Sequence, residues 1–272
     1  MHGMIGIYFF SFDSYTWTGF NSSLEAPSIA NPMGNPGLGE ETATDGLNWL
    51  GYLVTTFNES SILSYNFASY GATVNNSAIP AFPPGPRDLV QQATDFREHY
   101  CDDHAGWDAE TSLFGIWIGI NDVYHSSTMA DPSASIQADI QSYTELYHQL
   151  YDCGARRLLV MNVPQITRTP ALLADHQSHR DAVYDSVLHF NFLLEREIAL
   201  WNNNHTPDAS SPTHIFFFNA WAFTDYVLDN PIAFGFRDSS CIGEGCIWWD
   251  DFHPTSQFHR LLAAELQSTL HI

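Results

Sequence analysis

Five short runs of apolar residues, set apart along the chain, constrain what this sequence can fold into more than any other feature. Runs that are apolar almost throughout are typical of parallel β-strands covered on both faces, whereas half-exposed strands alternate apolar and polar residues. The runs occupy residues 5–12, 62–68, 113–118, 157–162 and 214–219. They predict a sheet of five parallel strands, which needs crossover connections between its strands.

Four of the intervening segments carry the helical spacing that such crossovers use. Apolar residues recur at intervals of three and four in residues 47–57, 133–151, 179–201 and 256–270, which predicts amphipathic helices. Thr44 or Asp45 is the expected N-cap of the first helix, and Thr255 or Ser256 that of the last. Strands alternating with helices predict an α/β fold in the form of a three-layer α/β/α sandwich.

We expect one domain over residues 1–272. Two stretches rich in Gly and Pro, residues 31–39 and 78–86, are predicted loops, but strands and helices resume soon after each. Residues 1–4 are too short for a signal peptide and are interpreted as a replacement start. The sequence contains no apolar run long enough to span a membrane.

The charge balance excludes several classes of partner. The chain has nine Lys and Arg residues together and 31 Asp and Glu residues, for a formal net charge of −22 at pH 7. Such a surface repels phosphate backbones and anionic lipid headgroups, so nucleic acid and membrane are not expected partners. Protonation of part of the carboxylates relieves their repulsion, which predicts a fold that is most stable in mildly acidic solution. We expect a monomer.

The cysteines and the glycosylation motifs favour a secreted protein. Cys241 and Cys246 flank Ile-Gly-Glu-Gly, a turn-prone spacer suited to a short disulfide loop. Cys101 and Cys153 could form a second bridge, and the sequence leaves that pairing open. Four Asn-x-Ser/Thr motifs are candidate N-glycosylation sites, at Asn21, Asn58, Asn75 and Asn204.

Polar residues that could carry chemistry follow several of the predicted strands. Active sites of open parallel sheets form at the carboxyl ends of the strands. Ser14 follows the first run, Gly71 the second and Asn121 the third. Near the C-terminus, Asp250 and His253 stand three residues apart, a spacing that lets a carboxylate contact one imidazole nitrogen and leaves the other free for a serine proton.

Taken in order, these residues resemble the four sequence blocks of the SGNH (GDSL-type) hydrolase superfamily. The matching elements, which extend the resemblance from Tyr8 to about His259, are Asp13-Ser14, Gly71, Gly119-Ile-Asn121 and Asp250-x-x-His253-Pro-Thr. Residues 154–164 and the Cys241/Cys246 pair are similar to plant and fungal members. Residues 12–20 and 31–39 are most similar to fungal acetylesterases of carbohydrate esterase family 16. The resemblance implies a flavodoxin-like sandwich and an esterase that uses no metal or organic cofactor.

The resemblance also implies a role for each matching residue. Ser14 would be the nucleophile, His253 the general base and then acid, and Asp250 the carboxylate that orients the imidazole. The backbone N–H groups of Ser14 and Gly71 and the side chain of Asn121 would form the oxyanion hole. The implied reaction is removal of acetyl groups from carbohydrate esters, such as hemicellulose-derived oligosaccharides, by a secreted enzyme that forms an acyl-enzyme.

Four positions need separate interpretation. The family has Gly where Phe12 precedes Asp-Ser, and the larger ring could narrow the site or reshape the turn. Asp251 competes with Asp250, which is favoured because the family acid stands three residues before the His. Trp17 is the aromatic residue expected to face the cleft. Residues 99–104 include His, Cys and Asp, but a helix end with Cys101 in a disulfide is favoured over a metal site.

Two other functions remain as alternatives. The first is a lipase or longer-chain acyl esterase of the same superfamily, which a chain-length series of p-nitrophenyl esters would separate from an acetylesterase. The second is a catalytically weak carbohydrate-binding protein on the same scaffold. Phe12 is its only support in the sequence.

Overall fold

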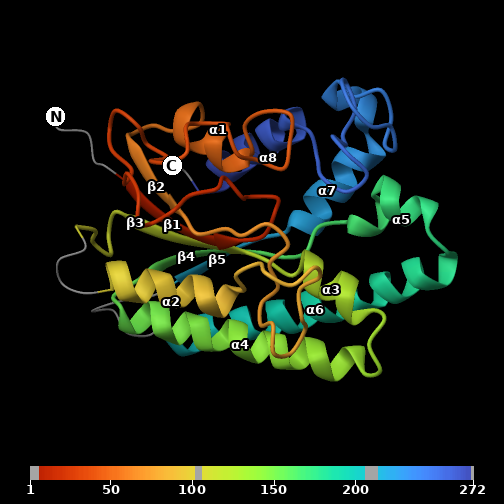
Figure 1. The fold of residues 1–272 in the computed structure, drawn as a ribbon, viewed down its shortest axis with the longest axis horizontal. Coiled ribbons are helices and arrows are strands. Elements are labelled where there is room, and N and C mark those ends of the chain that lie inside the picture. The colour runs from red at the N-terminus through yellow and green to blue at the C-terminus, as the bar shows by residue number, and fades with distance from the viewer. Residues whose placement is uncertain (1–5, 102–105, 206–213, 271–272) are drawn as a thin grey trace.

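A sheet of five parallel strands forms the middle layer of the molecule (Figure 1). The computed structural model describes residues 6–101, 106–205 and 214–270. The strands are β1 (Gly6–Phe12), β2 (Ile62–Asn66), β3 (Ser112–Trp117), β4 (Arg157–Met161) and β5 (His214–Phe218). Their order is β2-β1-β3-β4-β5, and every neighbouring pair is parallel. This is the order of flavodoxin-like sheets, and the α/β fold predicted from the sequence is confirmed.

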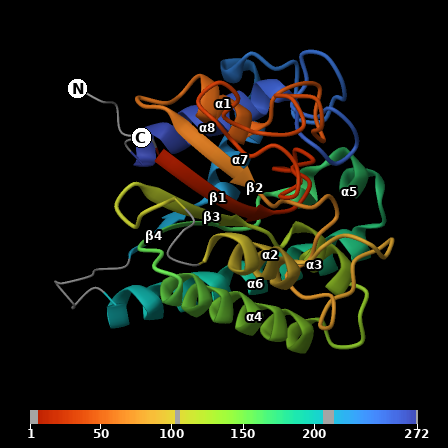
Figure 2. The ribbon, with the colours of Figure 1, turned by 60° about the vertical axis from the view of Figure 1, so that its left-hand side comes forward.

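Helices cover both faces of this sheet, as Figures 1 and 2 show. One face carries α1 (Trp49–Thr55), α7 (Ala220–Asp229) and α8 (Ser256–Leu270). The opposite side carries α2 (Leu89–Tyr100), α3 (Ile120–Ser126), α4 (Pro132–Asp152) and α6 (Gln177–His205). A short helix, α5 (Pro170–Ala174), and two 3₁₀ turns, Ile166–Arg168 and Pro231–Phe234, complete the described elements.

The spacing of apolar residues predicted four of these helices and missed the other four. The predicted ones are α1, α4, α6 and α8. Helices α3 and α7 start within three residues of a buried strand, so their apolar residues merge with the strand pattern. Helix α5 has only five residues, and α2 buries a Gln among its apolar residues.

The core lies between the sheet and each helix layer. All six residues of β3 are buried, as expected for a central strand covered on both faces. The inward positions predicted for α4 are all buried as well: Ile136, Ile140, Tyr143, Tyr147 and Leu150. The Tyr143 hydroxyl donates to the Ile116 carbonyl at 3.3 Å, so this buried polar tip is paired.

The expected cap of the first helix is wrong, whereas Thr255 stands at the cap position of the last one, where its carbonyl accepts from the His259 N–H at 3.1 Å. Asn48, which is buried, caps α1 by accepting a hydrogen bond from the Gly51 N–H at 3.1 Å. Asp45 instead accepts from the N–H of Ser256, the first residue of α8, at 2.7 Å. The Thr255 and Ser256 hydroxyls donate to backbone carbonyls outside α8. The loop before α1 therefore supplies the acceptor at the start of α8, a pairing between segments far apart in sequence.

Two disulfides tie the chain together. The predicted Cys241–Cys246 bridge is confirmed, and its half-cystines are five residues apart. The pairing that the sequence left open is also present, because Cys101 at the end of α2 is bonded to Cys153 at the end of α4. Residues 102–104 of the rejected metal motif lie outside the described part of the chain.

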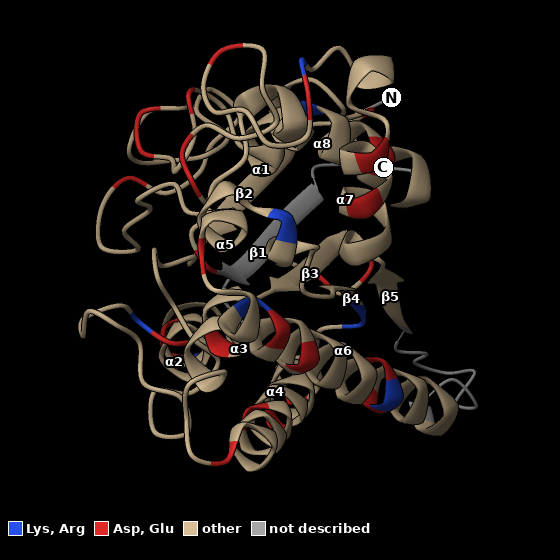
Figure 3. Ribbon diagram, turned by 90° about the vertical axis from the view of Figure 1, so that its right-hand side faces the viewer, with Lys and Arg blue, Asp and Glu red and all other residues tan. Residues whose placement is uncertain are grey.

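Asp and Glu residues are spread over the loops and helices, with few Lys and Arg residues between them (Figure 3). Within the described residues, no helix combines the length and the apolarity needed to cross a bilayer.

Candidate active site

The turn after β1 places Ser14 at the carboxyl edge of the sheet. Within this turn, the Tyr15 N–H donates to Asp13 Oδ1 at 3.1 Å. The N–H groups of Thr16 and Trp17 donate to the Asp13 carbonyl. Asp13 therefore organises the turn through backbone hydrogen bonds and holds the neighbouring serine at the end of the strand.

A chain of hydrogen bonds connects Ser14 with the C-terminal loop. The His253 Nε2 atom lies 3.0 Å from Ser14 Oγ, and its Nδ1 atom lies 2.8 Å from Asp250 Oδ2. Ser14 and His253 are buried, whereas the Asp250 side chain is 46% exposed. The structure thus brings together residues that are more than 230 positions apart in the sequence.

The geometry distinguishes Asp250 from Asp251. Besides contacting the imidazole, Asp250 accepts hydrogen bonds through Oδ1 from the N–H groups of Phe252, at 2.8 Å, and His253, at 2.6 Å. Burial raises the pKa of Asp250, but these bonds and the one from the imidazole outweigh burial and hold the pKa below its ordinary value. Asp251 is bound to Ala171 through its backbone carbonyl. The carboxylate that orients His253 in this structure is therefore that of Asp250.

Hydrogen bonds to the backbone carbonyls of Phe252 and His253 fix the position of His253. The Tyr15 hydroxyl donates to the Phe252 carbonyl at 2.7 Å, and the Trp249 N–H donates to the His253 carbonyl at 2.8 Å. His259 is buried close by, and burial, followed by repulsion from His253, lowers its pKa to about 3. His259 is therefore neutral, and no second positive charge opposes protonation of His253.

Gly71 and Asn121 flank Ser14 on the other side of the site, and all three line one pocket. Gly71 has a φ of +77°, a left-handed conformation that favours glycine. A Cβ atom there would lie 3.2 Å from the Pro86 ring. Asn121 uses one amide hydrogen to donate to the Ala72 carbonyl at 2.8 Å, which leaves the other free to meet a substrate oxygen.

Asp122 was missed as a site residue by the sequence reasoning. It is fully buried, and its Oδ1 accepts a hydrogen bond from the Val74 N–H at 2.8 Å. The sequence feature that could have identified it is an acidic residue between Asn121 and Val123, in a segment that is otherwise largely apolar. Asn121 and Asp122 together attach the loop after Gly71 to the start of α3.

The pocket at Ser14 has a volume of about 570 Å³. Its walls include aromatic side chains that the sequence reasoning did not select: Tyr70, Phe82, Tyr124 and Phe252. Trp17 is not among the residues that line the pocket. It packs edge-on against Tyr70, which does line the pocket, with ring centroids 5.7 Å apart. A role of Trp17 in substrate binding stays a prediction.

Phe12, the departure from the family pattern, is the last residue of β1. Its backbone pairs with Trp117 in β3, so the position is an ordinary strand position that any residue adopts. The side chain of Phe12 lies outside the described part of the structure. Its effect on the site stays a prediction.

The four glycosylation motifs lie in different surroundings. Asn21 is exposed in a turn, where its Oδ1 accepts hydrogen bonds from the N–H and hydroxyl of Ser23. Asn58 is partly exposed. Asn75 donates through its amide nitrogen to the Ser142 hydroxyl at 2.9 Å. Asn204 is exposed near the end of α6, and the third residue of its motif lies outside the described chain.

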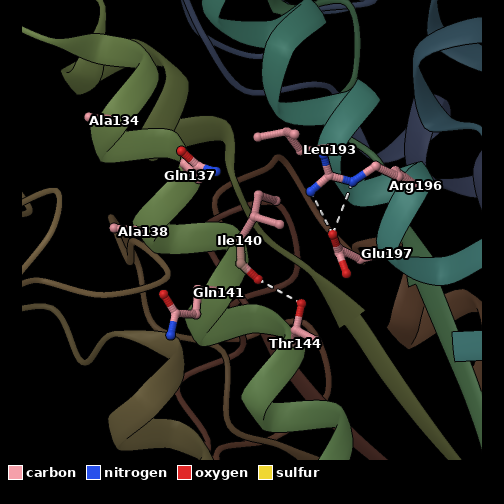
Figure 4. Close-up of a pocket in the computed structure, with 9 residues that line it drawn as sticks. All are labelled: Ala134, Gln137, Ala138, Ile140, Gln141, Thr144, Leu193, Arg196 and Glu197. Carbon is pink, nitrogen blue, oxygen red and sulfur yellow. Dashed lines mark hydrogen bonds and ion pairs between the residues drawn. The ribbon is translucent and has the colours of Figure 1, made fainter. Parts of the chain in front are cut away.

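A second hollow lies between α4 and α6, well apart from these residues (Figure 4). It measures about 450 Å³ and is lined by outward side chains of the two helices, including Gln137, Gln141 and Arg196. Arg196 pairs with Glu197 at 2.7 Å. Among the described residues, no group of three His, Cys, Asp or Glu side chains is placed to hold a metal ion.

A serine, a histidine and an aspartate joined in this order beside a pocket define the active-site arrangement of serine hydrolases. Residues 13–266 match the family model of the GDSL-like lipases/acylhydrolases, and the chain belongs to this family. Its class is therefore that of the carboxylic ester hydrolases.

The comparisons with individual proteins agree with this class. The chain is 36% identical over 265 residues to an acetylesterase of Thermothelomyces thermophilus, an alignment that covers 92% of this chain and 83% of the relative. A GDSL esterase/lipase of Arabidopsis thaliana is 28% identical over 155 residues, or 47% of this chain and 42% of the relative. A catalytic mutant of an acetylxylan esterase from Geobacillus stearothermophilus superposes with a TM-score of 0.56 at 15% identity, covering 97% of this chain and 94% of that one. At this identity the structural likeness concerns the fold alone.

Proposed function

We propose that the protein is a secreted serine esterase that removes acetyl groups from carbohydrate esters through an acyl-enzyme. The observation that carries the proposal is the hydrogen-bonded chain from Asp250 through His253 to Ser14 at the wall of an open pocket. The identity of 36% to an acetylesterase over most of both chains supports acetyl as the acyl group.

The geometry suits general-base activation of Ser14. Asp250 accepts the Nδ1–H of His253, which leaves Nε2 unprotonated and 3.0 Å from the serine oxygen. As Ser14 Oγ attacks the ester carbonyl carbon, His253 takes the serine proton, and Asp250 stabilises the imidazolium that forms. The imidazolium then gives this proton to the sugar oxygen as the C–O bond breaks.

The oxyanion of the tetrahedral intermediate needs donors on the opposite side of Ser14. We assign this role to the N–H groups of Ser14 and Gly71 and the free amide hydrogen of Asn121. Each such donor typically contributes about 10²–10³-fold in rate. A water molecule activated by His253 then attacks the acetyl-serine, which releases acetate and restores the Ser14 hydroxyl.

The walls of the pocket support a neutral, ring-shaped leaving group. Tyr70 and Phe82 are 49% and 78% exposed, so both offer ring surface on which a sugar could stack. No Lys or Arg is among the residues that line the pocket, and burial lowers the pKa of its His125. Together with the net charge of −22, these features favour an uncharged ester over a phospholipid or a uronate.

Secretion rests on separate support. Two disulfides in one chain are typical of proteins that mature in an oxidising compartment. Asn21 is exposed, whereas a glycan on Asn75 would have to replace its hydrogen bond to Ser142. Expression in a fungal or yeast host, followed by enzymatic deglycosylation of the protein recovered from the medium, tests both points.

The central test measures hydrolysis of p-nitrophenyl acetate and acetylated xylo-oligosaccharides by the wild type and by Ser14→Ala. The proposal predicts release of acetate from both substrates by the wild type and a loss of at least about 10³-fold in the variant. A p-nitrophenyl series should show a sharp fall beyond butyrate. Activity that increases with chain length would favour a lipase, and a wild type inert on every ester would favour a carbohydrate-binding protein.

A further inference from the structure

Two buried carboxyl groups lie next to each other behind the loop that carries Gly71. Asp122 on α3 and Asp139 on α4 are both fully buried, and their side chains are within hydrogen-bonding reach of one another. Asp122 Oδ2 receives no hydrogen bond from the described residues. Neither oxygen of Asp139 has a hydrogen bond of ordinary geometry there, although the backbone N–H of Asn75 lies close enough to oppose the rise of the Asp139 pKa. None of the ion pairs in the described part of the chain includes either residue.

The fourth carboxyl oxygen of the pair, Asp122 Oδ1, binds the loop that contains Gly71. Asp122 Oδ1 accepts from the Val74 N–H at 2.8 Å, and the preceding residue, Asn121, donates to the Ala72 carbonyl at 2.8 Å. Two adjacent side chains of α3 thus bind two backbone groups of residues 71–74. The position of Gly71 beside Ser14 therefore depends on Asp122.

Among the described residues, the ionisable groups that act on the pair are all acids. The ionisable groups that act on it are Asp88 from α2, Asp13 from the turn after β1 and Tyr143 from α4. Burial raises the pKa of both paired carboxyls, and the charge of Asp122 raises that of Asp139 further. Two facing buried carboxyls without a cation cannot both ionise, so the pair keeps one proton.

We propose that Asp139 is a positioning residue for the oxyanion hole, whose protonated carboxyl donates a hydrogen bond to Asp122 Oδ2 and so keeps Asp122 on the Val74 N–H. This inference rests on the serine esterase mechanism proposed above. When the shared proton leaves to solvent, two facing carboxylates repel each other, and Asp122 moves away from Val74. Because oxyanion donors act in the transition state, the displacement lowers kcat and leaves KM nearly unchanged.

Asp139→Asn and Asp139→Ala separate this role from a merely structural one. The Asn amide donates to Asp122 without needing a titratable proton, whereas Ala removes the donor and leaves Asp122 unpaired. Glu145→Gln is the matched control, since this exposed residue of α4 undergoes the same change from acid to amide away from the pair. The assay is kcat and KM for p-nitrophenyl acetate from acidic to alkaline pH.

We expect Asp139→Asn to stay within about threefold of the wild-type kcat at acidic pH and to lose the wild-type decline of kcat at alkaline pH. Asp139→Ala should lower kcat by about 10- to 100-fold at every pH, with KM within about twofold. Glu145→Gln should match the wild type throughout. An alkaline decline in Asp139→Asn identical to that of the wild type would overturn the proposal, and this comparison holds even if Asp139→Ala fails to fold.

Infrared spectroscopy tests the shared proton without relying on turnover. At neutral pH the wild type should show the C=O stretches of two buried carboxylic acids, that of Asp13 and that of the pair. The band of the pair is the one that Asp139→Asn lacks and Asp13→Asn keeps, and it should disappear on alkaline titration. Absence of the band from the wild type would overturn the proposal. A wild type that shows the band but hydrolyses no ester would instead refute the proposed function and leave the proton assignment intact.

Discussion

Replacing Asp13 with Asn should stabilise the protein, and increasingly so as the pH rises. Asp13 is buried, and burial raises its pKa from 3.8 to about 8, assisted by the charge of Asp122 and opposed by the Tyr15 N–H. Its Oδ2 atom has no hydrogen-bond partner among the described residues. Asn keeps the Oδ1 acceptor for the Tyr15 N–H, with a group that is neutral at every pH.

The size of the effect follows from proton linkage. Between pH 3.8 and about 8 the unfolded chain releases the Asp13 proton while the folded chain keeps it. The unfolded state then binds fewer protons, so the free energy of unfolding falls as the pH rises. Each pH unit contributes about 1.4 kcal/mol, which amounts to about 4 kcal/mol at pH 7. With an unfolding entropy of about 2.1 cal/mol/K per residue, this corresponds to a shift in Tm of about 7 °C.

Thermal unfolding followed by circular dichroism at acidic and neutral pH measures this difference. The Tm of Asp13→Asn should be close to that of the wild type near pH 4 and about 7 °C higher at pH 7. Asp152→Asn, at an exposed position of α4, controls for the loss of one negative charge. A difference between Asp13→Asn and the wild type that stays constant across this range would refute the reasoning.

Three further outcomes are expected from other parts of the structure. Asp250→Asn should lower kcat by about 10²–10⁴-fold because it breaks the bond to the imidazole, whereas Asp251→Asn should change kcat less than about threefold; the reverse ranking would contradict the assignment. Gly119→Ala should cost about 2–5 kcal/mol in urea unfolding, because φ is +126° and the new Cβ would lie 2.7 Å from core side chains, and an unchanged midpoint would disprove the clash. Replacing both Cys101 and Cys153 with Ser opens a bridge of sequence separation 52 and should cost about 4 kcal/mol, while equal Tm values would show that the bridge adds no stability.

Local patterns in the sequence were sufficient to predict the architecture. A continuous apolar run indicates a strand that is buried on both faces, and apolar residues at intervals of three and four indicate a helix that is buried on one face. Each pattern lies within the sequence of a single strand or helix. Five of the seven buried positions of α4 were predicted for this reason, and the two that were missed are Asp139 and Leu146. Ser14, Asp250 and His253 could likewise be selected as candidates, because each stands in a short motif with a recognisable spacing.

The tertiary structure decided whatever depends on contacts between distant segments. It selected Asp250 over Asp251, packed Trp17 edge-on against Tyr70, and put Asp45 at the start of α8. It also brought Asp122 and Asp139 together in the interior, where two carboxyls must share a proton. The spacing of residues along the chain does not predict these contacts between distant residues. They form only when separate helices and loops pack together and bury the side chains concerned.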